Sequence, residues 1–396
     1  MLVSKEIADK LKTNTLYNTV ALHSPDGSFE DITGESIVLD SFSLENEIVE
    51  KELKFGGCIA SEMSVKLIDY DCSALIGKTV QVIITATYLE SELYPSDDLY
   101  PSNTLICPAE TGTVECPAFY GKIQSAQRDK KQRNIVKITA YDAFYDMSKV
   151  DMSLWFGGKE NYGYAHYQKD DNFKSFYSII AEFAKDYAIT GVSPPSLSIF
   201  SVPLKFDDTC VEKVIKDITT LSDLIQAYAE LTLSFAVIDA DGKMRFKRLY
   251  SQSSVETIDS YKDLSFEDYE LEPIRMYSAK FADKKVFLYG NSNDFSWYVS
   301  DNILMRCRTT ASDIGTKYNS VNFFGDVYKY RPTKIKLFSY WWLEAGDKYT
   351  IKTPFEDLPT IETFVFNKKM DGFITALTSK GEKRLGKEVK ENEQIQ

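Results

Sequence analysis

Histidine is the residue type that this chain most lacks, because its 396 residues include only two, His23 and His166. A zinc peptidase of the H-E-x-x-H type needs paired histidines at helical spacing, and two isolated histidines cannot supply them. A cysteine peptidase needs a histidine beside its thiol, so it requires a fold that brings one of the two to a cysteine. No residue is therefore assigned a catalytic, cofactor-binding or metal-binding role, and no cofactor is expected.

Cysteines are also few and scattered, and none of them shows the C-x-x-C spacing of a zinc ribbon. The six are Cys58, Cys72, Cys107, Cys116, Cys210 and Cys307. Cys107 and Cys116 lie close enough in sequence to cross-link a loop. Synthesis in a reducing cytoplasm favours free thiols, and the sequence leaves open whether these two pair.

Long apolar runs are absent as well, and so is an excess of positive charge. No stretch of about 18 apolar residues exists, which excludes a membrane-spanning helix. The N-terminus MLVSKEIADKLKTN does not have the pattern of a signal peptide, so a cytoplasmic site of synthesis is expected. A net charge of −13 repels phosphates, which predicts a protein that can surround DNA without holding it.

The chain is rich in aromatic residues, with 25 tyrosines and 24 phenylalanines. These residues favour strands and interfaces over long helices, so a sheet-rich protein is predicted. A length of 396 residues exceeds a single hydrophobic core and suggests two to four domains.

The stretch FGGCIAS, residues 55–61, raises a chemical alternative, because two glycines precede a cysteine and a serine. A phosphate-binding loop leads into a helix, whereas this loop leads into alternating apolar and polar residues at 62–68, which predicts a strand. We therefore interpret Gly56 and Gly57 as a turn between strands, and catalysis by Cys58 as the less favoured alternative.

Alternation predicts further half-buried strands in GKTVQVII from Gly77 and NIVKITAYD from Asn134. The basic run RDKKQR at 128–133 is interpreted as a solvated hairpin tip rather than a phosphate site. Asp239-Ala240-Asp241-Gly242 predicts a second hairpin, because Arg248 stands where a calcium loop needs glutamate.

Helical periodicity predicts three helices. An apolar stripe runs from Phe173 through Tyr187, a second helix covers 211–218, and a third begins at Thr220, where Asp223 completes an approximate capping box.

Two aromatic features are candidates for interfaces. The segment LYPSDDLYPSN, Leu93–Asn103, repeats Leu-Tyr-Pro-Ser, and its prolines exclude a central strand. It presents Tyr94 and Tyr100 either to a partner or to its own domain, and both alternatives stay open. Trp341 and Trp342 are adjacent, so in a strand they face opposite sides, which predicts one in the core and one at an interface.

A weak internal repeat links the two ends of the chain. GKTVQVII from Gly77 and GDKYTIKT from Gly346 are each followed by a strand, a charged turn and an Ile-Thr-Ala segment, at Ile138 and at Ile374. The shared order suggests two copies of one β-unit.

Four segments in this order resemble the baseplate hub proteins of tailed bacteriophages and related tail-like particles, a family that includes the N-terminal structural part of tail-associated lysins. They are residues 44–69, 118–147, 220–249 and 341–353. The resemblance covers about residues 35–385. It implies an α+β, β-rich fold with two tube-type β-barrel domains and smaller α+β domains, assembled as a pseudo-hexameric trimer ring.

This resemblance sets the expected organisation. Residues 1–145 would form a first tube-type β-barrel domain with the Tyr-Pro loop, 146–232 a helical or α+β domain, and 233–335 a β-rich α+β domain. Residues 336–385 would complete a second tube-type β-barrel, and 386–396 would be a charged tail. A C-terminal hydrolase domain is not expected, because the chain ends soon after the second barrel.

The resemblance also implies a function. We expect a structural, non-enzymatic hub in the virion at the distal end of the tail tube, assembled in the host cytoplasm, with an acidic wall around the DNA ejection channel. Partners would be the tail tube protein, distal tail or baseplate proteins, and a tip, spike or tape-measure protein. A tail-associated cell-wall hydrolase and a receptor-binding tail protein are the alternatives.

Overall fold

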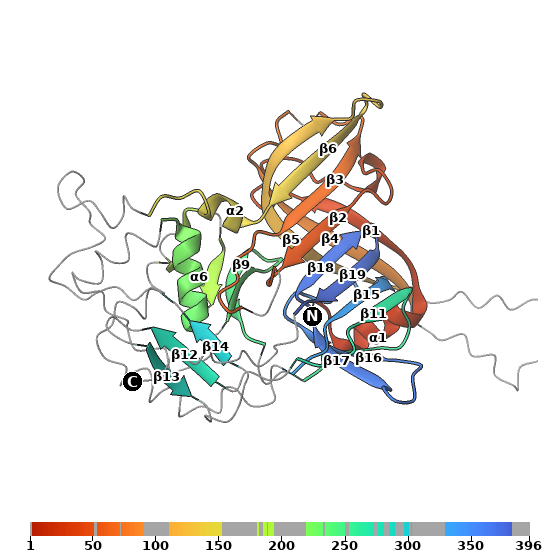
Figure 1. Cartoon of the computed structure of the whole chain (residues 1–396). Coiled ribbons are helices and arrows are strands. Elements are labelled where there is room, and N and C mark those ends of the chain that lie inside the picture. Colours follow the sequence, from red (N-terminus) through yellow and green to blue (C-terminus); the bar gives the residue numbers. More distant parts are fainter. Residues whose placement is uncertain are drawn as a thin grey trace, which may run out of the picture.

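The protein is described by a computed structural model (Figure 1). The described residues are 2–50, 54–71, 73–90, 111–152, 180–181, 185–187, 189–193, 219–232, 234–249, 253–271, 276–280, 285–289, 297–300, 302 and 329–381. Strands dominate this part of the chain and helices are short, so the predicted β-rich α+β fold is confirmed at that level. None of the described helices is long and apolar enough to cross a membrane.

The largest element is an open sheet of ten strands, in the order β1-β4-β5-β6-β3-β2-β18-β19-β15-β11, and all its pairings are antiparallel. In that order the strands span Thr15–His23, Thr79–Leu89, Thr111–Arg128, Ile135–Tyr141, Glu62–Ile68, Ser43–Glu47, Asn367–Asp371, Ile374–Ser379, Thr333–Phe338 and Asp263–Phe266. Strands from both ends of the chain therefore share one sheet, and Figure 1 shows the late strands β18, β19 and β15 following β2.

Three smaller sheets accompany it, each of three strands. One joins β10 (Glu256–Ile258), β16 (Lys348–Lys352) and β17 (Thr360–Phe364). Another joins β7 (Gly191–Ser193), β9 (Lys243–Lys247) and β8 (Phe235–Ile238). The third joins β13 (Lys285–Tyr289), β12 (Met276–Lys280) and β14 (Trp297–Ser300), beside the helix α6 in Figure 1.

Alternation in the sequence correctly predicts the central strands. Val80, Val82 and Ile84 of β4 are fully buried, and the intervening residues are partly exposed. The basic run 128–133 is the exposed tip between β5 and β6, as predicted.

The helices are α1 (Lys5–Asn14), the 3-10 turn η1 (Gly34–Ser36), α2 (Ala143–Met147) and α6 (Leu221–Leu231). Helix α6 begins with the predicted capping box: the Thr220 hydroxyl accepts the Asp223 N–H, and the Asp223 carboxylate accepts the Thr220 N–H. The hairpin at 239–242 joins β8 to β9, with Gly242 at φ +76°, so that prediction is confirmed too.

The two tryptophans correct a prediction. Both side chains are 0% exposed, so neither tryptophan lies on the surface where it could contact a partner. They follow β15 in a turn rather than a strand, because Ser339 and Tyr340 have left-handed backbones at φ +64° and +60°. The turn removes the strand alternation, and the two rings pack edge to face in one core at 5.7 Å.

Several predictions lie outside the described residues. These are the Tyr-Pro loop 93–103, most of the helix 173–187, the helix 211–218 and the tail 386–396. The domain boundaries proposed from the sequence stay predictions.

Candidate functional site

The two halves of the chain contain a similar order of strand pairings, with one difference in direction: β1 and β4 are antiparallel, whereas β10 and β16 are parallel. In the first half the order is β1-β4-β5-β6-β3-β2. In the second half β10 pairs with β16 and β16 with β17; then β18 pairs with β19, β19 with β15, and β15 with β11. Strands β17 and β18 follow each other along the chain and together take the place of the long strand β5. We call these two sets the first and the second β-unit.

The units also share hydrogen bonds at one glycine turn. Gly77 donates to the Ile123 carbonyl at 2.7 Å, and the Ile123 N–H donates to Lys78 at 2.9 Å. Gly346 donates to the Val365 carbonyl at 2.7 Å, and the Val365 N–H donates to Asp347 at 2.9 Å. Both glycines have positive φ, +84° and +89°, a conformation that favours glycine. Ile123 and Val365 therefore occupy equivalent positions.

A second shared feature is a left-handed residue directly after β3 and β15. Asp69 (φ +52°) donates to the carbonyl of Asn134, and Ser339 (φ +64°) donates to that of Phe373, each at 2.9 Å. Asn134 and Phe373 directly precede β6 and β19, so those strands are equivalent. The Ile-Thr-Ala segments lie in these two strands but three residues out of register, so the repeat is real while that sequence match does not align it.

The units are joined by the antiparallel pairing of β2 with β18. Across this pairing the Lys369 ammonium lies 3.2 Å from the Glu45 carboxylate, and Asn367 donates to the same residue at 3.2 Å. Lys380 forms an ion pair with Glu47 at 3.4 Å. These are cross-strand contacts between residues more than 300 positions apart in sequence.

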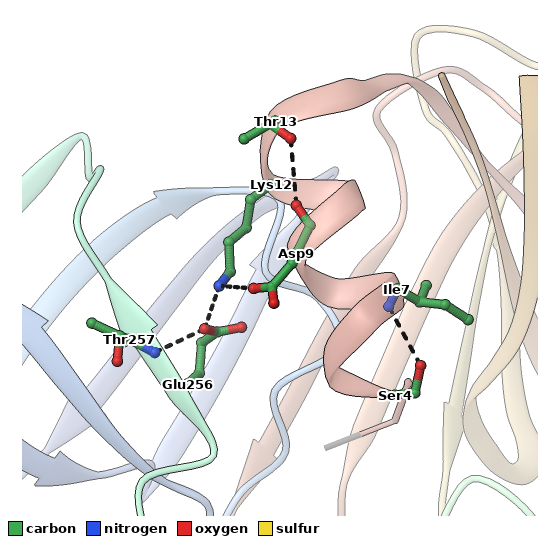
Figure 2. Close-up of polar contacts among 7 residues, drawn as sticks. All are labelled: Ser4, Ile7, Asp9, Lys12, Thr13, Glu256 and Thr257. Atoms are coloured by element: carbon green, nitrogen blue, oxygen red, sulfur yellow. Dashed lines mark hydrogen bonds and ion pairs between the residues drawn. The ribbon is translucent and has the colours of Figure 1, made fainter. Parts of the chain in front are cut away.

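Helix α1 makes a second contact between the two units, which no pattern in the sequence predicts. Its N-cap Ser4 accepts the Ile7 N–H, and Ala8 and Leu11 are buried. Lys12 forms an ion pair with Glu256 of β10 in the second unit, and Asp9 lies 2.8 Å from the same ammonium group (Figure 2). The Glu256 side chain is only 1% exposed.

A small polar cavity of about 30 Å³ lies where both units meet the β8–β9 hairpin. Its charged and polar lining consists of Asn46, Ser61, Tyr120, Asp142, Asp239, Glu344 and Lys368. Lys368 is fully buried and donates to the Trp341 carbonyl. A space of this size holds about one water molecule.

Three groups that line this cavity have shifted pKa values, caused by burial and by nearby charges. It raises the pKa of Asp142 to about 7, against hydrogen bonds that its carboxylate accepts from Ser61 and Phe144. Burial lowers the pKa of Lys368 to about 8, although Glu344 and Asp347 act in the opposite direction. Burial would raise the pKa of Glu344, but nearby positive charge, of which the Lys247 ammonium is the largest contribution, outweighs it and lowers that pKa to about 2.

Two carboxyl groups with pKa values pushed apart are typical of an acid and base pair in catalysis. Here the cavity has no room for a saccharide ring, and Asp142 is the N-cap of α2. The arrangement therefore gives no support to a glycosidase site.

The FGG turn is part of the same junction rather than a phosphate loop. Gly56 (φ +90°) donates to the Ser234 carbonyl at 2.9 Å, and Ala236 donates to Gly57 at 2.8 Å. A side chain on Gly57 would place its Cβ 2.1 Å from the Ile48 carbonyl oxygen. Gly57 thus allows the turn to pack closely on Ile48, while its carbonyl and the Gly56 N–H bond to the β8 side.

The thiol and histidine candidates do not form a catalytic pair in the described structure. Cys58 is buried, which raises the pKa of its thiol well above its usual range. Cys116 is a free buried thiol, and burial raises its pKa to about 11, while Cys107 lies outside the described residues. His23 is half exposed and pairs with Asp31 at 2.8 Å. His166 lies outside the described residues.

Metal binding finds no support in the described part of the chain, which contains no group of three or more histidine, cysteine or acidic side chains able to hold an ion.

Comparison with known proteins gives matches by structure but not by sequence. No family model and no curated protein matches the sequence. The tail protein from Neisseria meningitidis MC58 matches with a TM-score of 0.50 and 12% identity, over 91% of this chain and 95% of that one.

Two further solved structures match at lower scores. The 43 kDa tail protein of prophage MuSo2 from Shewanella oneidensis has a TM-score of 0.45 and 9% identity, over 91% and 97% of the two chains. An E. coli component of the type VI secretion system, described as similar to T4 bacteriophage tail proteins, has a TM-score of 0.33 and 8% identity, over 87% and 74%. The chain therefore shares the fold of the Neisseria tail protein, in agreement with the resemblance stated for its sequence.

Proposed function

We propose that this chain is a structural, non-enzymatic tail protein that forms a homotrimeric ring at the distal end of a tail tube. The observation that carries the proposal is the repeated β-unit, whose two copies are fused edge to edge through β2 and β18. Three chains around an axis present six nearly equivalent units, which is the geometry needed to dock on a hexameric ring. Each unit, closed by its neighbours, would act as a tube-type barrel.

The face of the sheet that points away from the core would line the channel. It continues from β6 to β11 across both units and carries charges of both signs. Its lysines are Lys66, Lys137, Lys334, Lys336 and Lys369, and its acidic residues are Glu45, Glu47, Glu62, Asp263, Glu267 and Asp371. Among the described residues this face is nearly balanced in charge, which differs from the acidic wall that the resemblance implies. A balanced wall neither binds DNA tightly nor repels it strongly.

Its partners would be the tail tube protein on one side and a distal tail, baseplate, tip, spike or tape-measure protein on the other, with DNA passing through unbound. The test is the mass of the purified full chain by light scattering, alone and with its tail tube protein. A trimer, or a complex of three subunits on six, is expected. A monomer in both samples would overturn the proposal.

The hydrolase alternative rests on the carboxyl groups of the junction cavity. The small volume of this cavity argues against a hydrolase. Release of sugars or peptides from purified peptidoglycan by the protein would support the hydrolase alternative.

A further inference from the structure

The junction between β2 and β18 shows how an edge strand of one β-unit pairs with an edge strand of the other. Because the two units are equivalent, each strand that forms this junction has a counterpart in the other unit. The counterpart of β2 is β11, and the counterpart of β18 is the end of β5. Both counterparts lack a partner strand on the corresponding side in the described structure.

Among the described strands, β15 alone pairs with β11, so the outer edge of β11 has no partner there. Leu44 of β2 faces Met63, and Phe266 of β11 faces Thr333, the equivalent of Met63. In β2 the even-numbered residues bond to β18, because the flanking Ile48 donates to Phe366 and Phe42 accepts from Gly372. Directly after β11, the odd-numbered residue Glu267 donates its N–H to the carbonyl of Pro332, which directly precedes β15. The N–H and C=O groups of Leu264 and Phe266 therefore point outward.

The end of β5 likewise has one edge that no described strand pairs with. Pairing with β4 stops at Lys122, whereas pairing with β6 continues to Arg128. Asp129 donates to Ile135 on the β6 side, so the N–H and C=O groups of Ala126 and Arg128 point the other way. In the second unit the equivalent residues, Lys368 and Met370, are the ones whose backbone N–H and C=O groups point to β2.

We propose that β11 of one copy pairs antiparallel with residues 125–129 of β5 in the next copy, in the register of the β2·β18 junction. Within the chain Glu45 faces Lys369, Leu44 faces Met370 and Ser43 faces Asp371. Transferred to the equivalent positions, Glu267 faces Gln127, Phe266 faces Arg128 and Ser265 faces Asp129. This inference rests on the proposed ring and specifies the strands that close it.

The chemistry of the two edges fits this register. Glu267 and Gln127 are both exposed on the face of the sheet that holds the Glu45–Lys369 ion pair. A Gln127 amide can donate to the Glu267 carboxylate in place of the lysine. The edge of β5 also ends in the basic tip, where Arg128, Lys130 and Lys131 are exposed, whereas Glu267, Asp268 and Glu270 are exposed beyond β11. The two edges thus carry opposite charge.

Cysteine cross-linking of the full chain tests the register. Glu267 and Gln127 would form a non-hydrogen-bonded pair, in which Cα atoms lie about 4.5 Å apart, within the range of a disulfide. The variant Glu267→Cys/Gln127→Cys should give disulfide-linked dimers and trimers under mild oxidation, with and without tube protein. Each single variant controls for the native cysteines.

Two matched variants control for geometry. Glu45→Cys/Lys369→Cys has the same pairing within one chain and should form an internal disulfide. Glu267→Cys/Ser125→Cys lies on the same face but two residues out of register, and it should cross-link at least about tenfold less, since its diagonal distance is roughly 7–8 Å.

The outcomes separate this inference from the proposed function. Cross-linked trimers from the Glu267 and Gln127 variant would support it. A trimer by light scattering that does not cross-link, while the Glu45 and Lys369 control does, would overturn the strand pairing and leave the ring intact. A monomer with and without tube protein would overturn both.

A charge pair provides a second readout. Gln127→Lys recreates the Glu45–Lys369 pair and should tighten assembly, whereas Gln127→Glu places two carboxylates opposite each other and should weaken it. The expected difference is about two- to fivefold in the dissociation constant for each contact. Equal affinities for both variants would contradict the register.

Discussion

The ion pair between Lys12 and Glu256 is the contact through which α1 stabilises the second unit, so its removal has a large expected effect. In Lys12→Met the apolar stem is kept and the ammonium is lost, which leaves Glu256 charged at 1% side-chain exposure. Breaking a buried pair from one side costs about 3–5 kcal/mol, because an unpaired charge remains buried.

The loss of stability in Lys12→Met is measured by thermal unfolding. For a folded unit of about 150–250 residues, 1 kcal/mol corresponds to roughly 2–4 °C, so a fall in Tm on the order of 10 °C is expected. Fluorescence is a suitable probe, since Trp341 and Trp342 lie in the same core as Leu11 of α1.

Two variants complete the test. Lys10→Met removes a surface pair with Glu6, at 3.6 Å and with Glu6 82% exposed, and should cost no more than about 1 kcal/mol. Lys12→Met/Glu256→Met removes both charges and should recover most of the loss. The reasoning is refuted if Lys12→Met is no less stable than Lys10→Met.

Three further predictions concern the junction. The pKa of Asp142 is raised from 3.8 to about 7, so the folded state binds a proton that the unfolded state has lost; stability should fall as pH rises from about 4 to 7, and Asp142→Asn should flatten this fall in urea midpoints measured against pH. The pKa of Lys368 is lowered from 10.5 to about 8, so stability should rise between pH 8 and 10.5, and Lys368→Met should remove that rise in the same assay. Gly57→Ala drives a Cβ against the Ile48 carbonyl and should destabilise the chain by several times the roughly 1 kcal/mol expected for Gly27→Ala, where φ is +67° and no atom lies within 4 Å, as measured by chemical unfolding.

Unchanged pH profiles in the Asp142 and Lys368 variants would show that other groups set the pH dependence. Equal stability of the two glycine variants would show that the FGG turn can move away from the Ile48 carbonyl.

Local features of the fold follow from the sequence, because they depend on neighbouring residues. Strand β4 is marked by alternation, the start of α6 by Thr220 and Asp223, and the β8–β9 hairpin by Asp241-Gly242. Each signal lies within a few residues of the structure that it predicts.

The junction could not be predicted in this way. Strand β2 reads SLENE and buries only Leu44, so it lacks an apolar pattern, and its partner β18 lies more than 300 residues away. The buried pair of Lys12 and Glu256 likewise joins residues 244 positions apart. The interpretation of one of Trp341 and Trp342 as an interface residue is wrong, because no sequence rule requires a left-handed backbone at Tyr340.

The fusion of two β-units on one chain would also change the thermodynamics of the proposed assembly. Each association of free subunits loses translational and rotational freedom, at an estimated cost of about 4–15 kcal/mol. The β2·β18 junction forms within the chain, so its partners meet at the high effective concentration of a tethered pair. A ring of six units built from such chains incurs the cost of association only at alternate junctions, which lets the remaining contacts be small and polar and still hold the ring together.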